Sequence, residues 1–141
     1  MEDILGNKIN IGDNVDYFDI DISSWKRITT EDSFFDINEV VHSEAVIHED
    51  RYKIGDFVAC TGTVSLRNGR FVMGLYLGTI IGVTLINLMY NSETPNFTTW
   101  YEIDLLDSYR RIGDKVIRER SHVIKVNLTV EQEILLKLNE D

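Results

Sequence analysis

The chain has 141 residues, 43% of them hydrophobic, with a formal net charge of −10 and a single cysteine, Cys60. This size and composition indicate one domain with a single core, and a lone cysteine excludes an internal disulfide framework. The first residues lack the basic and apolar regions of a signal peptide, and polar residues interrupt the most apolar run, 71–90. We therefore expect a soluble cytoplasmic protein, acting in the host cytoplasm if the chain is viral.

Strands are predicted along most of the chain from alternating apolar and polar residues and from β-branched content. In chain order they are expected at 10–19, 44–48, 55–65, 71–88, 98–105, 116–120 and 123–126. The segment 34–41 fits either a strand or a short helix. Residues 71–88 fit either one bent strand or two strands joined near Gly74 and Gly78.

Turns are predicted where glycine, asparagine and proline gather. The motif Ile-Gly-Asp-x-Val occurs three times, at 11–15, 54–58 and 112–116. Because glycine tolerates positive φ and aspartate bonds to nearby backbone, each copy indicates a tight turn that leads into a strand. Further connections are expected at 66–70, 90–96 and 107–113.

A short helix is predicted at the end of the chain. Thr129 and Gln132 have the spacing of a capping box, in which both side chains bond to amides at a helix start. Ile134, Leu135 and Leu138 form an apolar stripe at helical spacing. We expect this helix to pack on the strands and to close one open end of the β structure.

Four successive segments resemble the strands of a Src-homology-3-like small β-barrel: a Gly-Asp start, a Gly-x-Ile-x-Gly strand, a Tyr-x-hydrophobic strand and a final Val-Ile-Lys-Val strand. They lie at 54–58, 77–84, 100–107 and 118–126. The resemblance implies a mainly β fold with this barrel over residues 51–127. Residues 1–50 are then an acidic N-terminal elaboration packed on the barrel, and residues 128–141 a C-terminal capping helix, within one compact domain.

The opening residues 3–13, Asp-Ile-Leu-Gly-Asn-Lys-Ile-Asn-Ile-Gly-Asp, resemble those of small accessory proteins encoded by tailed bacteriophages. This resemblance implies a viral origin. Neither resemblance supplies an activity, because one fold serves many functions.

No set of residues predicts catalysis or a bound metal. His42, Glu44 and His48 share one face of a predicted strand, as zinc ligands would, but a fourth ligand is not evident and a solvated face is the simpler interpretation. The acids in 16–21 lack the glycine and the distant glutamate of a calcium loop. Cys60 falls on the inward face of its predicted strand. We expect no enzyme activity, no cofactor and no metal.

The net negative charge of the chain arises entirely in residues 1–50. Residues 1–50 contain 13 acidic and 3 basic side chains, whereas residues 51–141 contain 11 of each. The stretch 110–125 is rich in arginine and lysine. This separation makes the molecule an electrical dipole, which speeds association with a partner of opposite charge.

The acidic third is therefore expected to bind a basic surface on a host protein that processes nucleic acid or serves in defence, and so to modulate or inhibit it. Aromatic side chains would supply anchors. The predicted partner-binding residues are Asp13, Asp16, Asp19, Asp21, Trp25, Glu31, Asp32, Phe34, Phe35, Asp36 and Glu39. Direct binding of nucleic acid is not expected, because the net charge repels phosphate, and no membrane contact is expected.

The alternative is a structural subunit of a virion or of another symmetric assembly. The acidic third of one copy would then contact the basic stretch 110–125 of the next copy, head to tail. A homo-oligomer held together by charge dissociates at high salt, which separates this alternative from the first hypothesis.

Overall fold

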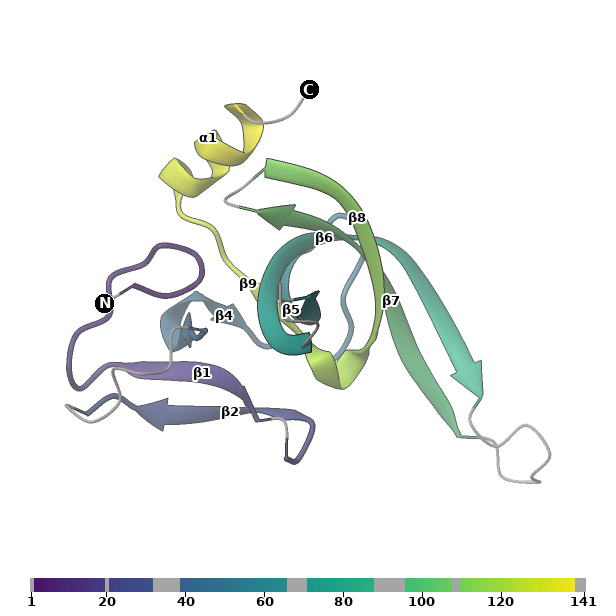
Figure 1. Ribbon diagram of the computed structural model, residues 1–141, viewed down its shortest axis with the longest axis horizontal. Coiled ribbons are helices and arrows are strands. Elements are labelled where there is room, and N and C mark those ends of the chain that lie inside the picture. Colours follow the sequence, from purple (N-terminus) through teal and green to yellow (C-terminus); the bar gives the residue numbers. More distant parts are fainter. Residues whose placement is uncertain are drawn as a thin grey trace.

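The computed structural model describes residues 2–19, 21–31, 39–65, 71–87, 96–107 and 110–138. Within these ranges the protein is mainly β, as predicted: two antiparallel sheets are followed by one short helix near the C-terminus (Figure 1). None of the helices within the same ranges is long and apolar enough to span a membrane.

The smaller sheet, here called the N-terminal sheet, has the strand order β2-β1-β3. β1 (Asn14–Asp19) and β2 (Ser24–Thr29) form an antiparallel hairpin, and β3 (Val41–His42) pairs with the other edge of β1. Val15 in β1 and Val40 just before β3 are buried in a small apolar cluster beneath this sheet. The sheet therefore has a fixed shape with its own core.

The larger sheet has the order β4-β9-β5-β6-β7-β8. From β5 to β8 the strands follow one another as an antiparallel meander, and a 3-10 turn, η3 (Arg120–His122), leads into β9. A second 3-10 turn, η2 (Ser43–Ala45), connects β3 to β4. The strands are β4 (Val46–Ile47), β5 (Phe57–Ser65), β6 (Phe71–Asn87), β7 (Phe97–Asp107), β8 (Arg110–Glu119) and β9 (Val123–Val126).

The larger sheet is open over the residues that the structure describes. β4 and β8 form its two edges, and no strand pairing joins them there, so the predicted closed barrel is not confirmed. Closure of a barrel depends on the tilt and stagger of every strand at once. Local sequence patterns do not encode these quantities.

β6 is one continuous strand of 17 residues, which decides between the two predicted forms of this segment. The register shifts between Ile80 and Gly82, where β6 carries an extra residue relative to β7. This irregularity lies further along the strand than the predicted bend near Gly74 and Gly78. The bulge lets a strand of this length change direction without losing its pairing.

The three Ile-Gly-Asp motifs have different roles in the fold. Gly12 and Gly55 lie in turns with φ of 94° and 96°, as predicted. Gly113 also has positive φ, at 79°, but it lies inside β8. There the register with β7 shifts between Asp104 and Leu106. The turn predicted over 107–113 is therefore wrong for residues 110–113, because glycine at this position permits a bulge within a strand.

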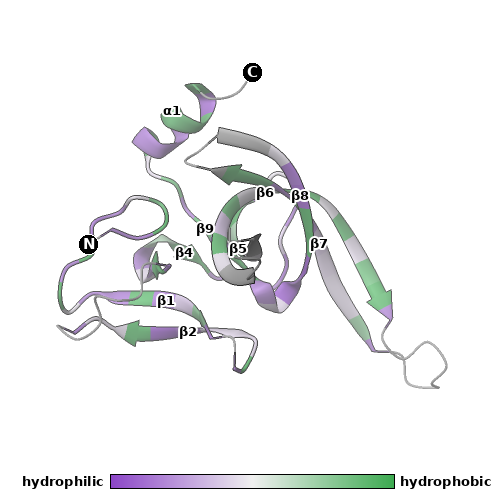
Figure 2. Ribbon diagram, viewed as in Figure 1, coloured by the Kyte–Doolittle hydropathy of each residue, from purple (hydrophilic) through white to green (hydrophobic). Residues whose placement is uncertain are grey.

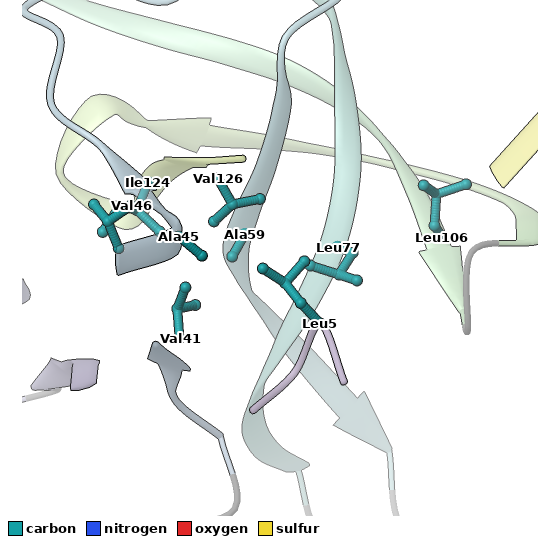
Figure 3. Packing of buried hydrophobic residues seen from close by; sticks show 9 residues of the cluster. All are labelled: Leu5, Val41, Ala45, Val46, Ala59, Leu77, Leu106, Ile124 and Val126. Atoms are coloured by element: carbon teal, nitrogen blue, oxygen red, sulfur yellow. The ribbon is translucent and has the colours of Figure 1, made fainter. Parts of the chain in front are cut away.

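The main hydrophobic core joins the N-terminal segment to the larger sheet. Figure 3 shows Leu5 next to Leu77 of β6, with Val41 of β3 facing the group formed by β4, β5 and β9. Leu5 and Val41 are 2% and 0% exposed. Full burial of such side chains contributes about 1.5–3 kcal/mol each, so the two parts of the chain stabilise one another.

The C-terminal helix α1 (Val130–Leu138) begins with the predicted capping box. The backbone N–H of Thr129 donates to Gln132 Oε1 at 2.9 Å, and the backbone N–H of Gln132 donates to Thr129 Oγ1 at 3.2 Å. The predicted packing of the stripe is wrong, because Ile134 and Leu138 are 51% and 75% exposed. Gln132 is the buried residue of the helix, and its amide donates to the backbone oxygen of Leu5 at 2.9 Å.

Candidate functional site

The N-terminal sheet carries the acidic residues predicted to bind a partner. Asp32, Phe34, Phe35 and Asp36 lie outside the described residues. The others fall into two groups: acids held by bonds within the chain, and acids that remain exposed and unpaired. The distinction decides which of them are available to a partner.

Asp16 belongs to the first group. Its side chain is only 7% exposed and accepts hydrogen bonds from Arg27 Nε at 2.8 Å and Ser43 Oγ at 2.7 Å. Arg27 Nη2 also lies 3.2 Å from His48 Nε2. The bond to Asp16 raises the pKa of Arg27 above its ordinary value. The prediction that Asp16 lies on an exposed face is wrong, because it joins β1, β2 and η2 from inside.

Asp13 is also held in place. Its Oδ2 accepts the backbone N–H of Asn10 at 2.8 Å and lies 3.2 Å from His42 Nε2. The hydrogen bond from Asn10 is the largest cause of the lowered pKa of Asp13, and His42 lowers it further. Asp13 therefore stays ionised, but its carboxylate is already partly engaged at the end of the sheet.

The side chain of Asp19 is 19% exposed and forms an ion pair with Lys26 at 3.3 Å, across the β1–β2 hairpin. Glu39 is exposed, but its Oε2 accepts the backbone N–H of Leu75 in β6 at 3.0 Å. This bond ties the segment before β3 to the larger sheet. Glu39 thus combines an accessible surface with a structural bond, whereas Asp19 is mostly enclosed.

Three acids in or next to the N-terminal sheet are exposed and form no ion pair with the residues that the structure describes: Asp21, Glu31 and Glu44. Asp21 lies in the turn between β1 and β2. Glu31 follows β2, and Glu44 lies in η2. Glu44 was outside the predicted binding set, and its place in η2, directly after β3, depends on the pairing of β3 with β1.

The exposed acids lie at both ends of the N-terminal sheet. Glu31 follows Thr30, whose backbone N–H donates to Asp13 at the start of β1, whereas Asp19 and Asp21 lie at the hairpin turn. Glu44 lines a separate hollow with Asn7, Lys8 and Asn127. A strand rises about 3.4 Å per residue, so the two groups are roughly 20 Å apart. The acids at the two ends therefore do not form a single continuous patch.

The predicted aromatic anchor Trp25 lies in β2 and is half-buried. Its ring packs against the main core and contacts Phe18 edge to face, with the ring centroids 5.9 Å apart. Phe18 in turn lies 4.8 Å from the ring of His122 in η3. These contacts join the hairpin to the larger sheet. The structure therefore shows Trp25 in a packing role and not as an exposed anchor for a partner.

A cleft of about 550 Å³ separates β2 from β4 and η3. Trp25, Arg27, Tyr52 and Arg120 are among the residues that line it. The Arg120 guanidinium lies 4.0 Å from the centroid of the Tyr52 ring and donates to the backbone oxygen of Glu49 at 2.8 Å. Burial raises the pKa of Tyr52, and the charge of Arg120 opposes that shift. The cleft wall is therefore held by cation–π and backbone contacts.

Sequence reasoning missed the structural role of Asp3. Its carboxylate is buried and accepts the backbone N–H groups of Leu5, Asn7 and His42 at 3.0, 2.7 and 2.8 Å. The short spacing of Asp3 from Gly6 and Asn7 is a turn signal that was available in the sequence. The bond to His42, 39 residues away, was not.

Three basic side chains of the stretch 110–125, those of Arg118, Arg120 and Lys125, form bonds within the chain. Arg118 Nε donates to the backbone oxygen of Thr61 at 2.8 Å, and Lys125 pairs with Glu49 at 3.1 Å and with Asp56 at 3.4 Å. The hydrogen bond to Glu49 is the largest cause of the raised pKa of Lys125. A head-to-tail contact through this stretch would have to break or share these bonds.

The two histidines considered as zinc ligands contact different residues. His42 contacts Asp13, and His48 contacts Arg27. Among the described residues, no three His, Cys, Asp or Glu side chains are grouped as a metal site would require. Cys60 is fully buried, and burial raises the pKa of its thiol to about 12, so its thiolate is scarce at neutral pH.

Comparison with known proteins adds no assignment. No protein-family profile, curated protein or solved structure matches this chain.

Proposed function

We propose that this protein is a non-enzymatic, phage-type accessory protein that binds a basic surface of a host protein through its N-terminal sheet. The observation that carries the proposal is the ordered arrangement of unpaired acids on this sheet, Asp21, Glu31 and Glu44. The basic side chains Lys26 and Arg27 of the same sheet are already paired with Asp19 and Asp16. Among the described residues, no ion pair offsets the charge of these three exposed acids.

The spacing of the acids favours a protein partner. Two groups of carboxylates roughly 20 Å apart exceed the reach of a small ligand. A standard protein interface buries about 800 Å² on each partner, which is wide enough to cover both groups. Oriented charge at this scale speeds association and selects partners of opposite sign.

A basic surface of this width is typical of proteins that bind nucleic acid. Occupation of that surface by the N-terminal sheet would compete with phosphate for the same lysine and arginine side chains. The proposed outcome is modulation or inhibition of a host protein that processes nucleic acid or serves in defence. Both proteins would meet in the host cytoplasm.

The proposed scaffold is a partly open relative of the Src-homology-3-like barrel. The order β9-β5-β6-β7-β8, with a four-strand meander and a 3-10 turn before the last strand, supports this proposal. The bulged β6, long enough to pair with both β5 and β7, supports it as well.

The first test compares two triple variants of equal net charge. Asp21→Asn, Glu31→Gln and Glu44→Gln neutralise acids of the N-terminal sheet. Exposed acids elsewhere give the matched control, which replaces Asp114, Glu131 and Glu133 by their amides. Both proteins carry a formal charge of −7 in place of −10.

Capture of host proteins from a bacterial lysate, followed by mass spectrometry, should yield a partner that the wild type and the control retain. The N-terminal variant is expected to retain roughly tenfold less of it at low salt, because three favourable charge contacts are lost. Equal capture by both variants, or an equal loss in both, would reject the proposal.

A further inference from the structure

The distal half of β6 and the start of β7 form a two-stranded arm, here defined as residues 82–87 and 97–101. The arm projects from the body of the molecule on the side away from the N-terminal sheet (Figure 1). β5 pairs with β6 only over 71–79, and β8 pairs with β7 only from Trp100 onward. Most of the arm therefore lies beyond the rest of the sheet.

One face of the arm continues the core face of the larger sheet. Val83 lies opposite Tyr101, which is fully buried, and Leu85 lies opposite Thr99 on the same face. Yet Val83, Leu85 and Phe97 are 45%, 65% and 59% exposed. Figure 2 shows hydrophobic colouring along β6 toward its end in the arm. The apolar face of the sheet thus continues beyond the buried core and is exposed in the arm.

The outer edge of β6 over 82–86 has no strand partner among the described residues. Such an edge presents backbone N–H and C=O groups that can pair with another strand. A two-stranded ribbon is only marginally stable in water, and a third strand or a covering layer stabilises it. The arm is therefore built to pair at this edge.

Charge selects the partner. Residues 71–87 and 97–101 contain no charged side chain, although the whole protein carries −10. The arm therefore offers no acidic side chain to a basic host protein that is recognised through charge. Two copies of this chain repel one another through their N-terminal sheets, but contact between arms leaves those sheets on the far sides of the pair (Figure 1).

We propose that the arm is a homodimerisation surface, at which the outer edge of β6 pairs antiparallel with the same edge of a second copy. Antiparallel pairing about a two-fold axis is self-complementary, so one strand serves both sides of the contact. Leu85 lies in the middle of the edge, and we place the two-fold axis near it. The apolar faces of the two arms then form one continuous surface. This inference does not depend on the proposed host partner.

The test is the concentration and salt dependence of the mass of the pure protein, measured by sedimentation. The wild type is expected to dimerise at micromolar concentrations and more tightly at high salt, because salt screens the repulsion between copies of charge −10. Leu85→Lys should weaken the dimer more than about tenfold, since it places like charges opposite one another. Ile54→Lys, at a residue that is 66% exposed in the turn before β5, should leave it unchanged.

A second readout locates the contact. Cys60, the only cysteine, is buried, so a cysteine introduced on the surface is labelled selectively. A short bis-maleimide should cross-link Leu85→Cys into dimers far more efficiently than Ile54→Cys. A wild type that stays monomeric at every concentration and salt, an oligomer that dissociates at high salt, or equal cross-linking at both positions would overturn the inference.

Discussion

Replacement of Asp3 by alanine is expected to lower the free energy of unfolding by about 4 kcal/mol, because it removes the acceptor of three backbone N–H groups at once. The N–H of Leu5 is part of a buried bond, and the Leu5 side chain is 2% exposed in the main core. Domains of this size have total stabilities of about 5–15 kcal/mol, so the loss would be a large fraction.

The graded variant Asp3→Asn keeps one carbonyl oxygen and should lose about half as much, since some of the N–H groups retain an acceptor. The control Asp21→Ala removes an exposed acid of the same charge and should change the stability by less than about 0.5 kcal/mol. Urea unfolding followed by tryptophan fluorescence measures all three. Equal midpoints for Asp3→Ala and Asp21→Ala would contradict the role assigned to Asp3.

Replacement of Gly78 by alanine is expected to lower the free energy of unfolding by about 3 kcal/mol, through overpacking in the centre of the larger sheet. A Cβ at this position would clash with the Ile103 side chain and lie 2.8 Å from the backbone oxygen of Asp104. Gly78 pairs with Val58 on one side and Leu105 on the other, so β6 cannot move away without disturbing two neighbouring strands.

Gly82→Ala is the matched control on the same strand. There a Cβ would lie 3.1 Å from the carboxylate of Glu102 and 3.3 Å from its Cβ. The exposed carboxylate can turn away, and the contact with Cβ needs a shift of only a few tenths of an ångström. We expect a change within about 1 kcal/mol. Thermal unfolding should give wild type and Gly82→Ala clearly higher melting temperatures than Gly78→Ala. Similar melting temperatures for the two variants would show that the close approach at Gly78 has been misjudged.

The sequence predicted those features that depend on neighbouring residues. The capping box at Thr129 and Gln132, the strands β5, β6, β7 and β9 and the turns at Gly12 and Gly55 were visible because their signals lie within a few residues. The mainly β class followed from them. The bulge at Gly113 was interpreted as a turn, because a glycine of positive φ serves both structures.

Features that depend on distant residues were not visible. Asp16 was interpreted as a surface acid, but Ser43, 27 residues away, and Arg27 enclose it. The stripe of α1 was expected to be buried, yet Gln132 is the residue that faces the N-terminal segment. Side chains of this kind are placed by strand order and register, which arise from the whole fold.

The sequence showed where the net charge lies, but it did not show how many of the acids are paired within the chain. The sequence placed the entire imbalance in residues 1–50, and the structure pairs part of it with bases from the same segment. What is left for a partner is a smaller set of exposed acids at two ends of the N-terminal sheet. This narrower set makes the proposed interface testable by single substitutions.

The most direct test of the proposed interface is amide hydrogen exchange, followed by mass spectrometry, of the protein alone and bound to the partner that it captures. Binding through the N-terminal sheet predicts slower exchange in 21–31 and 41–45, at both ends of the sheet, with the arm and β8 unchanged. Slower exchange confined to the arm or to the basic stretch 110–125, with the N-terminal sheet unaffected, would contradict it.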